Sequence, residues 1–354
     1  MKIQENVLIS QLTTMRLGGA CRYLAEIENE ADIKAAYEFV AKHNISSYIL
    51  GDGSNVIACD SGFEGLILLN RIRGIEVLDE TDDYLILRVA SGEELDDLSA
   101  YTVERDWYGA EALAEIPGTV GGAVMQNAGA YGQEMSQILL GVDAYDTQTS
   151  KSGVAARIDT GEEFVHIPVE DMELSYRHSI FNSDGPNSAK GRYFITAAHL
   201  RLHKQEMQGE LYGSLQAYLQ QQGIVDRQAK TIRDAIIDIR TQKLPNPATT
   251  ASSGSFFKNI TIDEADIEPL RKRFPGIPIF LIGGCWEIAS GWLIEQVGLK
   301  GKLLHGMRIS DKAALILINE SANSYDDMCK ARSEIVAAVK EHFGFELEQE
   351  PEEI

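Results

Sequence analysis

The chain has 354 residues, 44% hydrophobic and 24% charged, and its formal net charge is −22 at pH 7. This length allows two or three domains with a sizeable core. The acidic balance argues against nucleic acid as a partner, because a phosphate backbone requires a basic surface.

Nothing in the sequence reads as a targeting or membrane-spanning segment. The first twelve residues mix polar and acidic side chains, unlike the apolar core of a signal peptide. No window approaches the ~18 apolar residues of a membrane span. The cysteines have no CxxC spacing; they are Cys21, Cys59, Cys285 and Cys329. We therefore expect a cytoplasmic protein with reduced thiols, without a disulfide frame or a metal site.

The first seventy residues read as a small α/β unit, which a further strand and helix follow. Apolar residues at helical spacing predict a helix over 31–44. Short apolar runs at 46–51 and 65–70 predict strands. The alternating stretch at 82–92 predicts a further strand, and a helix is expected over 93–107.

The middle of the chain changes from strands to helices. After the glycine-rich stretch, β-rich segments stand at 139–149, 163–169 and 192–202. From about residue 206 the pattern turns helical, with amphipathic segments at 210–223 and 229–243.

The last hundred residues are expected to begin with a Ser/Thr/Gly loop at 249–259, followed by a helix at 290–299 and a strand at 313–320. The closing helix has Ser324 as its expected N-cap and Gly344 as its C-terminal glycine. The predicted fold class is α+β, with segregated β-rich and helical parts.

Residues 116–132 contain five glycines and no charged side chain. Glycine reaches positive φ cheaply and lets another group approach the main chain. A run of tight turns would explain the composition, and so would a cradle of backbone N–H groups around a phosphate-bearing cofactor. A second glycine-rich turn lies at 50–55. Neither stretch is a dinucleotide fingerprint or a P-loop.

Seven motifs occur in one order: "TMRLGG" (14–19), "LGDGSN" (50–55), "EIPGTVGGAVMQNAGAYG" (115–132), "YRHSIF" (176–181), "RTQKLP" (240–245), "SSGSFFKN" (252–259) and "SGWLIEQVGLKG" (290–301). Together they resemble the UDP-N-acetylenolpyruvoylglucosamine reductase family, flavoenzymes of bacterial peptidoglycan precursor synthesis. The resemblance runs from about residue 13 to the C-terminus. "GELYGSL" (209–215) resembles the subtype with a tyrosine-bearing loop over the substrate.

The resemblance implies FAD bound in a fold of the vanillyl-alcohol oxidase type. It implies two α+β FAD-binding subdomains at 1–70 and 71–204, with the tail 345–354 able to return to the first, and an α+β substrate domain at 205–344. The implied FAD-binding residues are Gly51, Gly53, Ser54, Asn55, Gly118, Thr119, Gly121, Gly122, Asn127 and Gly129.

The resemblance also implies the reaction. NADPH reduces FAD, which delivers a hydride to the β-carbon of the enolpyruvyl ether of UDP-N-acetylglucosamine, giving UDP-N-acetylmuramate. Negative charge moves toward the α-carbon and its carboxylate, so the site needs a cation and a proton donor. Carried over, Arg177 and Glu350 stabilise the enolate and Ser255 donates the proton. Each has a plainer interpretation: Arg177 could form a surface ion pair, Ser255 could cap a turn, and Glu350 could belong to a solvated acidic tail.

The substrate is a small UDP-sugar, and its implied contacts are Tyr131, Tyr212, Lys243 and Asn259. Lys243 would meet the diphosphate, although a lysine at a helix C-terminus also suits the helix dipole. Tyr212 would belong to the mobile loop, and a core aromatic is the alternative.

Three departures from the family pattern stand out. Gln349 replaces a proline in the tail "GFELEQEPEEI", and Ile260 replaces a proline after the Ser255 motif. Leu303 and His305 stand near a place where relatives offer glutamine and glycine, so Arg308 is a candidate substitute for a polar contact; His305 is assigned no role.

Two other functions are compatible with the sequence. An FAD oxidase of the same fold acting on an alcohol or aldehyde would give no reason for "SSGSFFKN" or Lys243. A catalytically silent sugar-nucleotide or flavin binder would give no reason for Arg177 and Ser255. The sequence leaves the oligomeric state open and is compatible with a monomer.

Overall fold

The computed structural model describes residues 1–147, 163–206, 209, 211–282 and 284–354. The chain forms two compact units. Unit 1 comprises Met1–Glu5, Tyr23–Asp52 and Glu64–Gln242, and unit 2 comprises Asn6–Arg22, Gly53–Phe63 and Lys243–Ile354. Each unit is therefore assembled from segments far apart in the sequence.

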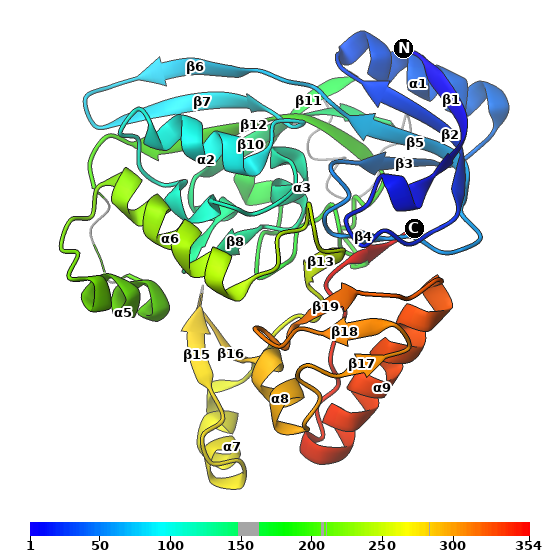
Figure 1. The fold of residues 1–354 in the computed structure, drawn as a ribbon. Coiled ribbons are helices and arrows are strands. Elements are labelled where there is room, and N and C mark those ends of the chain that lie inside the picture. Colours follow the sequence, from blue (N-terminus) through cyan, green and yellow to red (C-terminus); the bar gives the residue numbers. More distant parts are fainter. Residues whose placement is uncertain (148–162, 207–208, 210, 283) are drawn as a thin grey trace. The chain divides into compact units, whose positions relative to one another are not determined.

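A five-stranded antiparallel sheet in the order β11-β10-β12-β7-β6 forms the centre of unit 1. Its strands are β6 (Ile75–Glu80), β7 (Tyr84–Ala90), β10 (Leu139–Asp146), β11 (Phe164–Pro168) and β12 (Tyr193–His203). Alternate residues such as Leu85, Leu87 and Val89 point to one face and are buried. The helices α2 (Leu95–Val103) and α3 (Val120–Met125) pack against that face (Figure 1).

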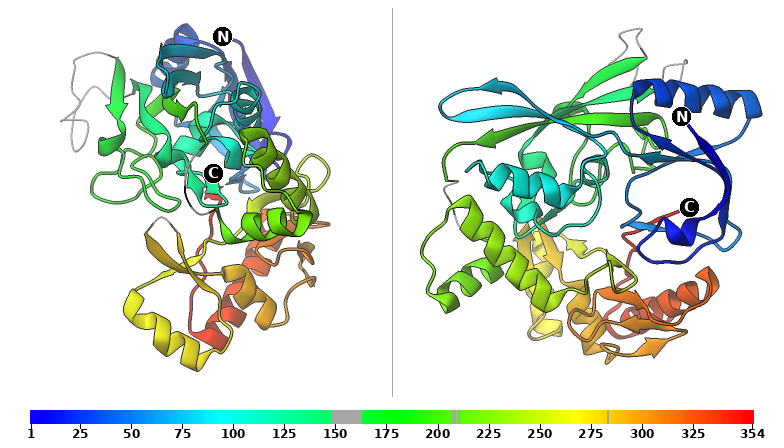
Figure 2. Two further views of the ribbon diagram at one scale, coloured as in Figure 1. Left: turned by 90° about the vertical axis from the view of Figure 1, so that its left-hand side faces the viewer. Right: turned by 45° about the horizontal axis from the view of Figure 1, so that its top comes forward.

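A second sheet has the order β1-β2-β5-β3 and is built from β1 (Ile3–Leu8), β2 (Ala20–Ile27), β3 (Ser47–Leu50) and β5 (Phe63–Asn70). Helix α1 (Glu30–His43) lies against this sheet, as Figure 2 shows. Ile33 and Ala36 of α1 are buried in one cluster with Leu66 and Leu68 of β5. Asn29 caps α1 by accepting a hydrogen bond from the Asp32 N–H. The short strands β8 (Gly129–Ala130) and β9 (Gln133–Glu134) form a separate ladder.

Two helices complete unit 1. They are α5 (Gly213–Gln222) and α6 (Ala229–Lys243), and the last residue of α6 begins the third segment of unit 2. Leu215 and Leu219 of α5 pack with Ile236 of α6 and with Ala112 and Ala114, which precede the glycine stretch. The apolar faces of these two amphipathic helices are thus buried in one common cluster.

Unit 2 has two small sheets, of orders β13-β19-β18-β17 and β14-β16-β15. Their strands are β13 (Ser252–Ser255), β14 (Ile260–Ile262), β15 (Ile279–Ile282), β16 (Cys285–Ile288), β17 (Leu303–Leu304), β18 (Met307–Ile309) and β19 (Ile316–Asn319). The helices are α7 (Ile267–Arg273), α8 (Ser290–Gln296) and α9 (Tyr325–Phe343). Met328, Ile335 and Phe343 of α9 enter a core shared with Phe256 and Phe257.

The C-terminal tail pairs with an early segment of the chain. Strand β20 (Glu352–Glu353) is parallel to β4 (Val56–Ile57), and Figure 1 shows this red tail beside β4. The Ile354 N–H also donates to Ile57 O at 2.9 Å. The tail is therefore part of a sheet, and the interpretation of a solvated acidic tail is wrong.

Most local expectations agree with these elements. Ser324 caps α9 by accepting a hydrogen bond from the Asp327 N–H at 3.0 Å, and Gly344 ends the helix at φ +83°. Residues 249–259 were expected to form only a loop, but they include β13. Residues 148 and 149, the end of the strand expected over 139–149, lie outside the described part of the chain.

All four cysteines are free thiols in the structure. Among the described residues, no helix is both long enough and apolar enough to span a membrane.

Candidate active site

Much of the glycine stretch packs against the chain's own backbone. The Val120 and Gly121 N–H groups donate to Glu93 O and Ser91 O at 2.9 and 2.8 Å. A Cβ added to Gly121 would lie 3.0 Å from the Ser91 Cβ. At this position glycine permits two backbone segments to meet, which agrees with the simpler interpretation of tight turns.

The earlier glycine turn behaves in the same way. A Cβ on Gly51 would lie 2.6 Å from Oγ1 of Thr119, and one on Gly53, at φ +63°, would lie 2.1 Å from Leu12 O. The Thr119 hydroxyl also accepts a 3.4 Å hydrogen bond from the Gly122 N–H at the start of α3. Within unit 1, the two predicted cofactor motifs therefore meet through Gly51 and Thr119.

Gly122 differs from these glycines because it is exposed. Apart from its chain neighbours and the backbone of its own helix, a Cβ there would have only the Thr119 hydroxyl within 4 Å among the described residues, at 3.7 Å. Gly118, two residues before α3, adopts φ +112°. Gly122 thus offers bare, uncharged main chain to which the ring or diphosphate of a flavin can approach. The residues present fit FAD at this surface, whereas Gly51, Gly53 and Gly121 are explained by the chain's own packing.

Asn127 connects the end of the glycine stretch to the "YRHSIF" motif. It is 1% exposed and has φ +44°. Its Nδ2 donates to Ser175 O at 3.0 Å and to Oε2 of Glu134 at 2.9 Å, and its Oδ1 accepts from the Ser136 N–H at 2.9 Å. Asparagine tolerates this left-handed backbone better than most residues. Its position indicates a structural role in orienting the neighbouring turn.

Arg177 lies in that turn. Ser175 and His178 exchange two backbone hydrogen bonds, so Tyr176 and Arg177 form the tip of the turn, with Arg177 at φ +52°. The Arg177 Nη2 donates to Gly129 O at 3.1 Å. The structure thus brings Arg177, a predicted catalytic residue, together with Asn127 and Gly129, which were predicted to bind FAD.

The two predicted substrate tyrosines also lie together. The rings of Tyr131 and Tyr212 meet edge to face at 6.1 Å between centroids. Burial raises the pKa of Tyr131, and the positive charge of Arg240 opposes that rise. Arg240 itself donates to Glu115 O at 2.8 Å, and burial lowers its pKa. Arg240 begins the "RTQKLP" motif but was not among the residues predicted to contact substrate.

In unit 2, Ser255 ends strand β13 opposite Ile316 of β19. The pairing is irregular between Ser252 and Ser255, where Gly254 has φ +75°. Phe256 and Phe257 follow and are buried, with their rings 5.1 Å apart. These two buried phenylalanines anchor the end of the strand.

The tail lies directly beside this segment. The Lys258 N–H donates to Glu348 O at 2.9 Å, and the Glu350 N–H donates to Phe256 O at 3.0 Å. The Asn55 Nδ2 donates to Glu350 O at 3.4 Å. These bonds fix the backbone of Glu350 beside the segment that follows Ser255. They also bring a predicted FAD-binding residue, Asn55, to the same tail.

The departures in the tail are accommodated by a set of contacts that we call the tail clamp: Arg332 of α9 with Gln349 and Glu353. The Arg332 Nη1 donates to Gln349 Oε1 and Glu353 Oε1, both at 2.6 Å. Burial raises the pKa of Glu353, but hydrogen bonds from Tyr325, Arg332 and Gln349 outweigh it and lower that pKa. Gln349, which stands where the family has proline, therefore has a specific partner.

Three further residues were predicted to contact the substrate or FAD: Asn259, Lys243 and Ser54. The Asn259 Nδ2 donates to Glu287 Oε2 at 3.0 Å, and its Oδ1 accepts from the Ser290 N–H at 3.3 Å, so this amide supports unit 2 itself. Lys243 is exposed at the end of α6. Ser54 accepts a 3.4 Å hydrogen bond on its carbonyl from the Thr14 hydroxyl.

The Arg308 side chain is bound to other residues of unit 2, so it does not replace the missing polar contact. It forms a two-pronged ion pair with Glu320, and its Nη1 donates to Gly301 O at 3.0 Å. His305 pairs with Glu334 at 2.6 Å, consistent with an ordinary surface histidine.

Comparison with known proteins defines the class first. Residues 21–150 match the family described as FAD binding domain, and residues 246–354 match that described as UDP-N-acetylenolpyruvoylglucosamine reductase, C-terminal domain. The chain is thus a flavoprotein of mixed helix and strand with an FAD-binding domain followed by a second domain, which confirms the expected fold class.

Similarity extends over the whole chain. A UDP-N-acetylenolpyruvoylglucosamine reductase of Amoebophilus asiaticus is 34% identical over 351 residues, covering 99% of this chain and 98% of that protein. One from Vibrio parahaemolyticus is 32% identical over 350 residues, covering 99% and 94%. The chain belongs to the UDP-N-acetylenolpyruvoylglucosamine reductase family. The crystal structure of the Thermus caldophilus reductase shares the fold, with a TM-score of 0.65, 21% identity and coverage of 100% and 99%.

Proposed function

We propose that this chain reduces the enolpyruvyl ether of UDP-N-acetylglucosamine-enolpyruvate to UDP-N-acetylmuramate in the cytoplasm, with FAD as cofactor and NADPH as co-substrate. The observation that carries the proposal is the ladder by which residues 348–350 pair beside residues 256–258. This pairing supports the assignment of Glu350, because it fixes the backbone of the altered tail beside the segment that follows Ser255. Family membership supports the same reaction.

The bound flavin supplies the hydride chemistry, taking a hydride from NADPH and passing one to the β-carbon of the substrate. The chain's own residues bind the substrate, stabilise the charge that develops and provide a proton. Each of these tasks falls to a different segment of the sequence.

Arg177 is proposed to hold the substrate carboxylate. A guanidinium is permanently charged and can grip a carboxylate with two N–H bonds. Its Nη2 donates to Gly129 O, which orients the group without neutralising it. A cation so placed favours the negative charge that develops at the α-carbon and its carboxylate.

Ser255 is proposed to donate a proton to the α-carbon, with Glu350 helping to stabilise the enolate. A serine hydroxyl is a weak acid, so it serves only against a strongly basic carbon and from a fixed position. The buried Phe256 and Phe257 and the paired tail supply that rigidity.

Lys243, Tyr131, Tyr212 and Asn259 are proposed to contact the UDP-sugar. The edge-to-face contact of Tyr131 and Tyr212 supports the tyrosine-loop subtype, because it places Tyr212 beside the glycine stretch. Lys243 is exposed and would meet the diphosphate with a local positive charge, which opposes the negative field of a chain of net charge −22.

The test is spectroscopic. The purified full-length chain is expected to carry flavin absorption, which NADPH bleaches under anaerobic conditions. Turnover driven by oxygen and an alcohol, with no response to NADPH, would instead indicate an oxidase. Absence of any spectral change would indicate a silent binder, and either result would overturn the proposal.

A further inference from the structure

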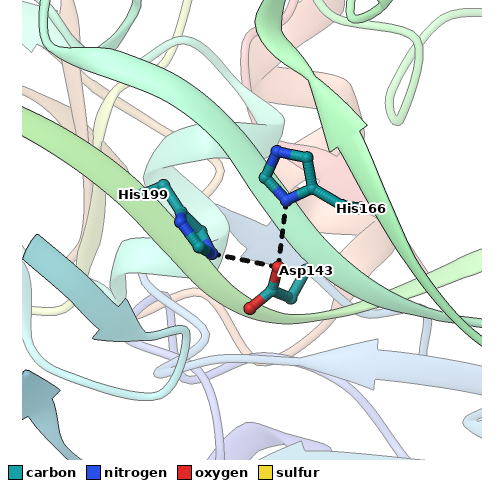
Figure 3. Close-up of side chains that lie close together, drawn as sticks. All are labelled: Asp143, His166 and His199. Carbon is teal, nitrogen blue, oxygen red and sulfur yellow. Dashed lines mark hydrogen bonds and ion pairs between the residues drawn. The ribbon is translucent and has the colours of Figure 1, made fainter. Parts of the chain in front are cut away.

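We propose that Asp143, His166 and His199 form a binding site for one transition-metal ion of the zinc type, on the face of the five-stranded sheet opposite α2 and α3. Figure 3 shows both imidazole rings directed at the Asp143 carboxylate. One ligand atom from each side chain lies within 4.8 Å of the other two. The site lies outside the residues proposed for flavin and substrate.

Strand register explains why the three side chains meet. Asp143 of β10 is directly paired with His166 of the edge strand β11. On the other side of β10, Gly141 is paired with His199 of β12. Residues 141 and 143 share one face of β10 because side chains alternate along a strand. The three ligands therefore come from three adjacent strands, whose backbones are fixed by hydrogen bonds.

Gly141 makes the space in which the rings meet. A Cβ at this position would lie 2.7 Å from Nε2 of His166. The rings of His166 and His199 lie edge to face, with 4.9 Å between centroids and 78° between planes. A larger residue at 141 would force the His166 ring away from β12, so the glycine is part of the geometry.

The distances resemble those of a metal site. Nδ1 of His166 and Nε2 of His199 each lie 3.0 Å from the same oxygen, Oδ1 of Asp143. A tetrahedral zinc site with bonds of about 2.0–2.1 Å has ligand atoms about 3.4 Å apart. Small side-chain rotations would bring the three atoms around one ion.

The Nε2 of His199 is closed off from solvent and lies 3.0 Å from Oδ1 of Asp143, so the carboxylate is its polar neighbour. A metal ion bound between these two atoms would replace the ion pair by two coordinate bonds.

Arg88 holds the other carboxylate oxygen. Its Nε donates to Oδ2 of Asp143 at 2.9 Å, and Arg88 is paired with His199 across β7 and β12. The carboxylate is thus held with Oδ1 facing the two imidazoles, as an outer partner commonly arranges for a ligand.

Two imidazoles and one carboxylate suit zinc and its neighbours, cobalt and nickel, better than magnesium or calcium, which prefer oxygen ligands. A bound ion would join the edge strand β11 to β10 and β12. The effect would be stabilisation of this sheet edge, without a part in the flavin chemistry.

The test uses the full-length, tag-free holoprotein. Zn²⁺ binding is measured by calorimetry, and Co²⁺ binding by its visible absorption, in wild type, His166→Ala and His199→Ala. His305→Ala is the matched control, because His305 also pairs with a carboxylate, at 2.6 Å from Glu334. Circular dichroism verifies that each variant folds.

The proposal predicts one ion per wild-type chain and an affinity about tenfold or more lower in each ligand variant, with the control unchanged. It also predicts slower amide exchange in β11 when Zn²⁺ is bound. Absence of binding to wild type, an unchanged affinity in His199→Ala, or a Co²⁺ spectrum with thiolate charge transfer from the cysteines would overturn it.

Discussion

The backbone N–H of Glu350 donates a 3.0 Å hydrogen bond to the carbonyl of Phe256, the residue that follows Ser255. This bond connects two proposed catalytic positions that are almost a hundred residues apart in the sequence. It means that the tail contributes to the geometry around Ser255, and that changes in either segment should affect the same half of the reaction.

Ser255→Ala is expected to leave NADPH reduction of the flavin intact and to stop reduction of the enolpyruvyl substrate, because it removes only the proton donor. Stopped-flow measurement of the two half-reactions separates these effects. Ser253→Ala, two residues earlier on the same strand, is the control and should retain substrate reduction. Normal overall turnover of Ser255→Ala would remove Ser255 from the mechanism.

Glu350→Gln is expected to slow the substrate half-reaction by about 10²–10⁴-fold, the range typical for loss of a group acting in proton transfer or charge stabilisation. Glu352→Gln is the matched control, since Glu352 belongs to β20 and its N–H donates to Asn55 O at 3.0 Å. If the damage came from Glu352→Gln instead, the assigned register of the tail would be incorrect.

Loss of the tail clamp should weaken both folding and activity. Arg332→Ala removes two hydrogen bonds to the tail. We expect the free energy of unfolding to decrease by about 1–2 kcal/mol. This figure is smaller than for fully buried charged hydrogen bonds, because the groups are partly exposed to solvent. Chemical denaturation measures this decrease in the free energy of unfolding. Lys340→Ala, which breaks the exposed pair with Glu346, should change stability by less.

The same clamp should respond to acid. The folded-state pKa of Glu353 is lowered, so its stabilising effect is complete above the unfolded-state pKa of about 4.3 and is lost as pH falls through the folded-state value. The difference in stability between wild type and Arg332→Ala should therefore shrink below about pH 4. A difference that grew on acidification would contradict this assignment.

Asn127→Ala should destabilise the protein by about 2–4 kcal/mol, because it leaves buried partners unsatisfied and removes the side chain suited to positive φ. It should also weaken substrate binding through displacement of the Arg177 turn. Asn187→Ala, which loses a hydrogen bond to Glu173, is the control and should have little effect. Thermal unfolding and KM together test the prediction, and equal stability of the two variants would disprove it.

Elements whose ends are determined by neighbouring residues in the sequence were predictable. The α9 caps at Ser324 and Gly344 depend on side chains within a few residues of the helix ends. Strand β13 was missed because it is short, rich in serine and paired with β19, about sixty residues later. The partner of the tail, β4, is almost three hundred residues away, so no local pattern could indicate it.

The site residues also fall into two groups: those that the sequence indicated, and those that depend on contacts made only in the folded chain. Motif order indicated Arg177, Gly129 and Asn127, which do lie together. The role of many glycines in the chain's own packing was not foreseeable, because Ser91 and Leu12 approach Gly121 and Gly53 only in the folded structure. Arg332 was missed because its partners belong to a tail that departs from the family pattern.

Anaerobic re-oxidation of the NADPH-reduced holoprotein tests the central claim most directly. Addition of UDP-N-acetylglucosamine-enolpyruvate in slight excess should restore the oxidised flavin spectrum, with formation of one UDP-N-acetylmuramate per flavin. A reduced flavin that persists until air is admitted, with the enolpyruvyl ether recovered unchanged, would contradict the proposed reaction.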